Sequence, residues 1–142
     1  RWHIVPMFAP SFFTGFLIRR FGAQPVAMAG FALIALSATG AATGLSAVHF
    51  YGALIVLGLG WNFSFIGATT MLATCVTETE KAAVQGANDT MIALVSTVCA
   101  FAAGLGISTL GWIVLALISI AIVLVAVLAL ALDRAVPARL ET

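Results

Sequence analysis

Charge is what this sequence has least of. Charged residues make up 8% of its 142 residues, whereas a soluble domain carries roughly a quarter, and 63% of the residues are hydrophobic. Six Lys and Arg against five Asp and Glu give a net charge of +1, without the basic clusters that nucleic-acid binding requires. The composition therefore excludes a soluble domain and a nucleic-acid partner, and it indicates an integral membrane protein whose solvent is the lipid bilayer.

The charges leave two long gaps. No Asp, Glu, Lys or Arg occurs between Arg20 and Glu78, or between Asp89 and Asp133. Each gap is long enough for two crossings, since a helix needs about 20 residues to span the hydrocarbon core, and the apolar N-terminal stretch adds a fifth. The apolar runs lack the alternation of β-barrel strands. We predict an all-α, polytopic transmembrane bundle with helices at about residues 2–18, 24–43, 48–76, 88–106 and 111–132.

The basic residues predict an orientation in the inner (plasma) membrane. Alternate loops lie on opposite sides, and short cytoplasmic loops are enriched in Lys and Arg. One side collects five of the six basic residues: Arg19, Arg20, Lys81, Arg134 and Arg139. We expect that side, and with it the C-terminus, to be cytoplasmic.

The first residues predict that the chain is a piece of something longer. Arg1-Trp2-His3 offers neither an initiator methionine nor the basic leader of a signal peptide. We expect a fragment whose upstream helices are missing, with a processed mature start as the alternative.

Catalytic side chains are scarce. The five carboxylates lie outside or at the rims of the predicted helices, and neither a His-Glu-x-x-His helix nor a Gly-x-Ser-x-Gly turn occurs. His3 and His49 both fall at the predicted outer rim, away from any serine at membrane depth. We predict that the protein is not an enzyme.

Cysteine is equally rare. Cys75 and Cys99 lie in separate predicted helices and have no metal-ligand spacing. We interpret them as small apolar fillers, and we expect no disulfide, no metal site and no cofactor.

The third predicted helix places an amide and an indole near the middle of the bilayer, in the segment from Gly58 to Gly67. An unpaired buried amide costs several kcal/mol, so Asn62 has to face protein or water. At helical spacing Asn62, Phe65 and Thr69 share a face, with Trp61 beside it. Two interpretations remain open: the face lines a substrate cavity, or Asn62 is an interhelical hydrogen-bond partner among close-packing glycines.

Two other predicted helices carry polar stripes. Ser11 and Thr14 lie on one face of the first, where they could instead satisfy backbone carbonyls around a kink at Pro10, and Ser96 lies in the fourth. The fifth is almost entirely aliphatic, and we expect it to face lipid all round. The candidate residues of a substrate pathway are Ser11, Trp61, Asn62, Phe65, Thr69 and Ser96.

The segment from Pro10 to Gly22 resembles the cytoplasmic loop signature of the major facilitator superfamily, Gly-x-Leu-x-Asp-Arg-x-Gly. The matching residues are Gly15, Leu17, Arg20 and Gly22, and the stretches from Gly58 to Phe63 and from Gln85 to Asp89 resemble those of a bacterial member. Arg19 stands where the signature has its acid. Asp89 is therefore a candidate partner for Arg19 or Arg20, or else only the cap of its helix.

The resemblance implies a partial major facilitator fold, the C-terminal half, with helices eight to twelve of twelve. In that family helices eight, ten and eleven line a central cavity and nine and twelve lie outside. The implied function is secondary active transport of a small organic solute by alternating access, with the missing N-terminal half as partner. The residues in the wall favour an amphipathic solute, while no carboxylate lies at membrane depth to reveal a coupling ion.

A different class of function stays open as the alternative. The chain could be a free-standing five-helix membrane protein with a structural or assembly role. In that case the same polar residues hold helices together, through contacts such as Gly40-x-x-x-Gly44.

Overall fold

The computed structural model describes residues 4–43 and 46–140, with side chains as far as Leu132. In this part of the chain every regular element is a helix, as predicted. The elements are α1 (Ile4–Phe8), α2 (Ser11–Phe21), α3 (Ala23–Thr43), α4 (Ala47–Thr74), α5 (Lys81–Thr109) and α6 (Trp112–Leu140).

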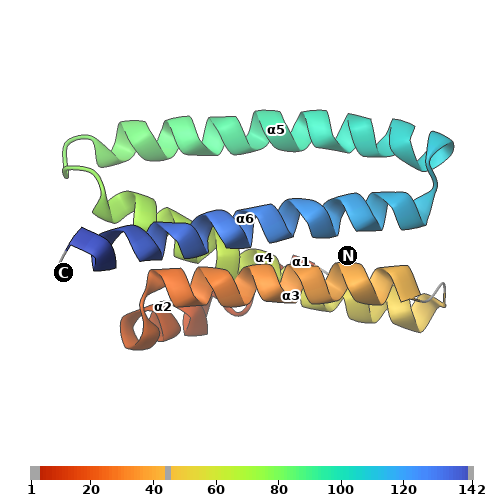
Figure 1. Ribbon diagram of the computed structural model, residues 1–142, viewed down its shortest axis with the longest axis horizontal. Helices are drawn as coiled ribbons and strands as arrows, with labels where there is room; N and C mark the ends of the chain where they lie inside the picture. Colours follow the sequence, from red (N-terminus) through yellow and green to blue (C-terminus); the bar gives the residue numbers. More distant parts are fainter. Residues whose placement is uncertain (1–3, 44–45, 141–142) are drawn as a thin grey trace.

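The four long helices run side by side along the length of the molecule (Figure 1). The α2–α3 turn, the α4–α5 connection and the end of α6 lie at one end of the bundle. The end of α3, the start of α4 and the α5–α6 connection lie at the other end. The most extensive packing is between α3 and α4, and α6 also packs against α3. The predicted cytoplasmic loops thus share one end of the bundle.

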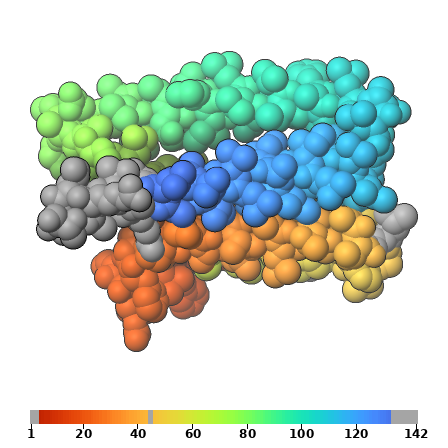
Figure 2. Space-filling model, in the orientation of Figure 1, coloured from red at the N-terminus to blue at the C-terminus, as the bar shows by residue number. Residues whose placement is uncertain are grey.

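Helix α5 is the least buried of the long helices in the described chain. Of the most apolar stretch of α5 only 6% is buried, against 28% for α4. Figure 2 shows α5 as a separate ridge along one edge of the molecule. Among the described elements, the main contacts of α5 are with its chain neighbours α4 and α6.

Four helices in the described chain are long and apolar enough to cross a membrane, namely α3, α4, α5 and the Trp112–Leu132 part of α6. The first predicted crossing is divided, because α1 ends at Phe8 and α2 begins at Ser11. Pro10 lies in this break, and a proline has no backbone N–H with which to continue a helix. The kink expected at Pro10 is therefore a break between two short helices.

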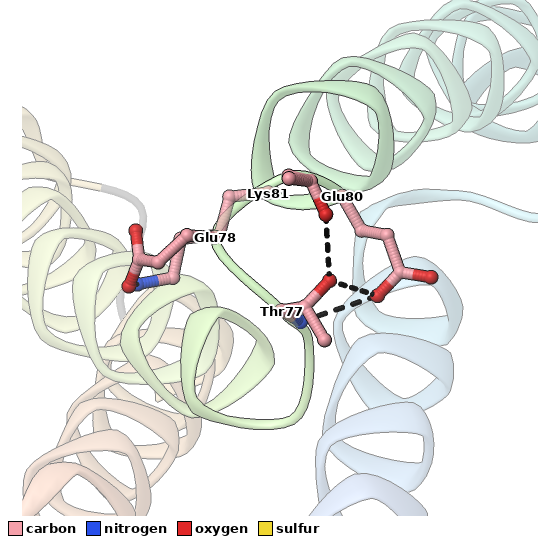
Figure 3. Close-up of polar contacts among 5 residues, drawn as sticks. Thr77, Glu78, Glu80 and Lys81 are labelled. Carbon is pink, nitrogen blue, oxygen red and sulfur yellow. Dashed lines mark hydrogen bonds and ion pairs between the residues drawn. The ribbon is translucent and has the colours of Figure 1, made fainter.

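The start of α5 differs from the prediction. The helix begins at Lys81, not near residue 88, and a hydrogen-bonded turn from Thr77 to Glu80, here called the cap, lies in front of it. The N–H and hydroxyl of Thr77 donate to Glu80 Oε2 at 3.2 and 2.6 Å (Figure 3). The N–H groups of Glu80 and Lys81 donate to the Thr77 carbonyl at 3.0 and 3.1 Å. Thr-x-x-Glu is the sequence signature of a capping box, so the sequence carried this signal.

The cap makes the first turn of α5 sensitive to acid. The hydrogen bond from the Thr77 side chain, followed by that from its backbone, lowers the pKa of the Glu80 carboxyl. Because the pKa of Glu80 is lower in the folded protein, the ionised carboxylate stabilises the cap at pH values above the ordinary carboxyl pKa. This stabilisation is lost as the pH falls through the lowered pKa. We expect the protection of the first amides of α5 against hydrogen exchange, relative to their intrinsic exchange rates, to fall in acid. The Glu80→Gln variant should show no such step, and equal pH profiles would contradict the cap.

The turn between α2 and α3 requires glycine at one position. Gly22 has φ +90° and ψ 158°, a conformation that essentially only glycine adopts, and its N–H donates to the Ile18 carbonyl at 2.8 Å. This local geometry explains the last glycine of the loop signature.

Replacement of Gly22 by alanine should therefore destabilise the protein by about 1–3 kcal/mol. Gly15 is the matched control from the same signature, because it lies inside α2 with nothing within 4 Å of an added Cβ. Gly15→Ala should be neutral or stabilise by up to about 1 kcal/mol. Denaturation in mixed detergent micelles measures both, and equal stability of the two variants would refute the argument.

Helix α6 does not face lipid on all sides, which corrects the prediction made for the segment at about residues 111–132. Ala116 and Val123 of α6 are buried. Two hydrogen bonds join α6 to α3, from Gln24 Nε2 to the Leu130 carbonyl and from Trp112 Nε1 to the Ala41 carbonyl, both at 2.9 Å. These bonds lie near opposite ends of α3 and hold the two helices in register.

Candidate functional site

The most buried polar side chain on α4 is Asn62, which is 1% exposed. Its Nδ2 donates to the Met7 carbonyl at 2.6 Å and to Ser11 Oγ at 2.8 Å. Its Oδ1 accepts from Thr14 Oγ1 at 2.6 Å, and Thr14 is 0% exposed. The amide thus connects α4 to both halves of the broken first helix.

The break explains why an amide is needed here. Carbonyls in the last turn of a helix have no partner within it, and a buried carbonyl without a partner is costly. Asn62 supplies a donor to the Met7 carbonyl at the end of α1, and Thr14 Oγ1 lies 3.0 Å from the Pro10 carbonyl. The interhelical hydrogen bonds that the sequence allows for Asn62 are therefore present.

Three aromatic rings lie beside this amide. The Trp61 and Phe65 rings are stacked, with centroids 4.7 Å apart and planes 8° from parallel. Phe8 of α1 meets Trp61 edge-on at 6.4 Å and 60°. Trp61 and Phe65 are half-buried, and Phe8 is 61% exposed. We call Phe8, Trp61 and Phe65 the aromatic trio.

The other two predicted pathway residues lie outside this cluster. Thr69 is half-buried farther along α4, where its hydroxyl donates to the Phe65 carbonyl at 2.8 Å. Its own carbonyl accepts from Gln85 Nε2 of α5 at 3.2 Å. Ser96 is exposed on α5. The structure therefore brings Ser11, Trp61, Asn62 and Phe65 together, and it does not bring Ser96 to them.

The loop signature is exposed at the end of α2. Arg19 and Arg20 occupy the last turn of that helix, where positive charge is favourable, and the Arg20 guanidinium lies 5.4 Å from the centroid of the Phe21 ring. Asp89 does not cap α5, because it lies about two turns inside a helix that starts at Lys81. Between the side chains that the structure describes, the one ion pair joins Lys81 to Glu78, so Asp89 is not paired with either arginine.

The cysteines are not apolar fillers of the packed bundle. Cys75 and Cys99 are both free and exposed.

The closest helix contact uses Gly60, which belongs to the glycines that the second interpretation expected to pack closely, and Gly30, which the sequence did not single out. An added Cβ at Gly30 would lie 2.4 Å from Ser64 N, and one at Gly60 would lie 2.8 Å from the Gly30 carbonyl oxygen. Gly40 has nothing within 4 Å, and Gly44 lies outside the described residues. The available signal was the spacing of small residues at Gly60, Ser64 and Gly67.

The sequence also matches a known family model, the Major Facilitator Superfamily, over residues 3–142. The chain belongs to the major facilitator superfamily. Among its relatives in that superfamily is a riboflavin transporter, RfnT of Brucella anthropi, which is 47% identical over 128 residues, 87% of this chain and 32% of RfnT. Two uncharacterized transporters of Bacillus subtilis, YdeG and YddS, are 36% and 35% identical over 66% and 65% of this chain. No solved structure matches.

The family and the relatives support a role in membrane transport in general, and they indicate a transporter rather than an enzyme. The chain spans about a third of the length of RfnT and 22% of each Bacillus relative. A free-standing structural protein, the alternative class of function, is not what this family supports.

Proposed function

We propose that the chain forms the C-terminal half of a secondary active transporter, corresponding to helices eight to twelve of twelve. The transporter moves a small organic solute across the inner membrane by alternating access. The observation that carries this proposal is the set of hydrogen bonds from Asn62 to Met7, Ser11 and Thr14 at the break between α1 and α2, here called the Asn62 cluster. Transporters of this kind build their sites around discontinuous helices near the middle of the membrane.

The substrate pathway in this proposal consists of Ser11, Trp61, Asn62, Phe65, Thr69 and Ser96. The aromatic rings of Trp61 and Phe65, with polar side chains beside them, suit an amphipathic solute. The name of the relative RfnT makes riboflavin the first solute to test.

The partner in this proposal is the N-terminal half of the same transporter. Its contact surface includes α5, whose side chains are nearly all exposed in the described chain although the exposed ones include Ser96 and Thr97. Polar side chains in a membrane helix rarely face lipid, so a protein partner is the better explanation for that face.

The orientation proposed for this transporter puts the C-terminus in the cytoplasm. Arg19, Arg20 and Lys81 all lie near the end of the bundle at which α6 ends. Concentration of basic residues on one side is typical of the cytoplasmic face.

The loop motif comprises Gly15, Leu17, Arg19, Arg20 and Gly22, with Asp89 as a partner of an arginine in another conformation of the cycle. A charge reversal tests this pairing. Asp89→Arg should impair transport, and Arg20→Asp in the same protein should restore it. Failure to restore transport with either Arg20→Asp or Arg19→Asp would remove Asp89 from the motif.

Uptake by the whole protein tests the proposed function. A bacterial strain that neither makes nor imports riboflavin would express the protein and receive radiolabelled riboflavin. Saturable uptake above that of the empty strain is the expected result. Absence of uptake would remove riboflavin as substrate, and absence of uptake or efflux across a panel of organic solutes would overturn the proposal.

A further inference from the structure

Asn62 has little capacity left for a solute. Both hydrogens of its amide are donated, to the Met7 carbonyl and to Ser11 Oγ, and its oxygen accepts from Thr14. A solute could replace these bonds only by breaking the contact between α4 and the two short helices. The amide is therefore better suited to hold protein groups in place than to bind a solute directly.

The group that Asn62 holds is the end of α1. Its bond to the Met7 carbonyl fixes the backbone next to Phe8, the last residue of that helix. The Phe8 ring in turn makes the edge contact with Trp61, which is stacked on Phe65. Asn62 thus fixes the relative position of two helices that together carry the aromatic trio.

The trio has the properties of a stacking surface. The parallel Trp61 and Phe65 rings and the edge-on Phe8 ring leave partly exposed aromatic area at the side of the buried amide. Aromatic rings bind other flat rings by offset or edge contacts, which add to the burial of apolar area. An aliphatic solute would gain only the burial.

The absence of charge restricts the solute further. Neither α1 nor α4 contains Asp, Glu, Lys or Arg. A charged ring placed here would lose its hydration without gaining a counter-ion from these helices. The part of the solute that meets the trio is therefore uncharged.

We infer that Phe8, Trp61 and Phe65 form a stacking surface for an uncharged, planar aromatic ring system in the transported solute, and that Asn62 is a positioning residue for this surface. The inference rests on the proposed function and names the substrate class of that site.

Riboflavin is the probe, because it joins a planar three-ring system to a flexible polyol chain. In cells expressing the whole protein, Trp61→Leu should raise the KM for riboflavin uptake roughly five- to 150-fold, the range expected when one stacking ring is lost. Trp61→Phe keeps a ring and should stay near the wild-type KM. Phe12→Leu is the matched control, since Phe12 is an aromatic residue of α2 that is 89% exposed.

Competition separates the two parts of the probe. Lumichrome, which is the ring system without the polyol, should inhibit uptake by the wild type and lose potency with Trp61→Leu. Ribitol, the polyol alone, should inhibit weakly and equally in both. Stronger inhibition by ribitol than by lumichrome would overturn the inference.

A double-mutant comparison tests the positioning role. Asn62→Ala should raise the KM in the wild type, but it should add little in a Trp61→Leu background, because both changes remove the same stacking contact. A purely structural role would give independent effects in the two backgrounds, and additivity would therefore refute the positioning role.

The failures are distinguishable. If the wild type takes up riboflavin and Trp61→Leu leaves its KM unchanged, the stacking surface is wrong while the transporter proposal stands. If the wild type transports only solutes without aromatic rings, the inference is overturned and the transporter proposal again stands. If the wild type transports no solute of any class, both fall.

Discussion

Replacing Gly30 with alanine is expected to destabilise the protein by about 3 kcal/mol, at the upper end of what overpacking costs. The added Cβ would lie 2.4 Å from both the backbone N and the Oγ of Ser64, and 2.7 Å from the Gly60 carbonyl oxygen. Two of these three atoms belong to the backbone of α4 and cannot rotate away. The variant therefore has to separate α3 from α4, which is the most extensive helix contact in the described chain.

The chain provides a matched control on each helix. Gly40 on α3 and Gly52 on α4 have nothing within 4 Å of an added Cβ, so Gly40→Ala and Gly52→Ala should be neutral or slightly stabilising. Gly60→Ala should behave like Gly30→Ala, because its Cβ would lie 2.9 Å from Ile34 N. Denaturation of the whole protein in mixed micelles measures all four variants. Equal stability of Gly30→Ala and Gly40→Ala would show that α3 and α4 do not approach so closely.

Replacing Asn62 with leucine is expected to cost about 2–4 kcal/mol. The change removes three interhelical hydrogen bonds, to Met7, Ser11 and Thr14, and such bonds in membrane proteins contribute about 0.6–1.7 kcal/mol each. It also leaves the Met7 carbonyl and the Thr14 hydroxyl to find other partners. The loss should appear both in the unfolding free energy and in the amount of folded protein recovered.

Two threonines provide the comparison for Asn62. Thr14→Val removes the bond to Asn62 Oδ1 without changing the side-chain shape, and it should cost about 1 kcal/mol. Thr39→Val should cost little, because the Thr39 hydroxyl is exposed and bonds only to the Ala35 carbonyl of its own helix. If Asn62→Leu were as stable as Thr39→Val, the Asn62 cluster would contribute nothing to the bundle.

The sequence was most informative where a residue differed from its surroundings. Asn62 stood out as an amide in an apolar helix, and the cost of burying it unpaired predicted that it would find partners. The sequence also identified Ser11 and Thr14, as polar residues on one face of the first predicted helix. Their assembly around one amide depends on how α1, α2 and α4 cross, and no local pattern contains that information.

The errors have a common physical origin. The sequence of α6 looked lipid-facing because Ala116 and Val123 are as apolar as the residues that face lipid, and hydrophobicity does not separate lipid contact from protein contact. Likewise Gly30 and Gly40 are both glycines on α3, and only the position of α4 leaves no room for a larger side chain at Gly30. The error at the start of α5 has a different origin, because the spacing of Thr77 and Glu80 is a local sequence signal for a helix start.

Counterflow in liposomes tests the central claim most directly. The purified whole protein would be reconstituted into vesicles loaded with the unlabelled solute that the uptake assay identifies, riboflavin first, with labelled solute outside. A carrier that exposes one site alternately to the two sides accumulates label transiently above its equilibrium level, and that overshoot is the predicted result. Entry of label only to equilibrium, or no entry, would contradict transport by alternating access.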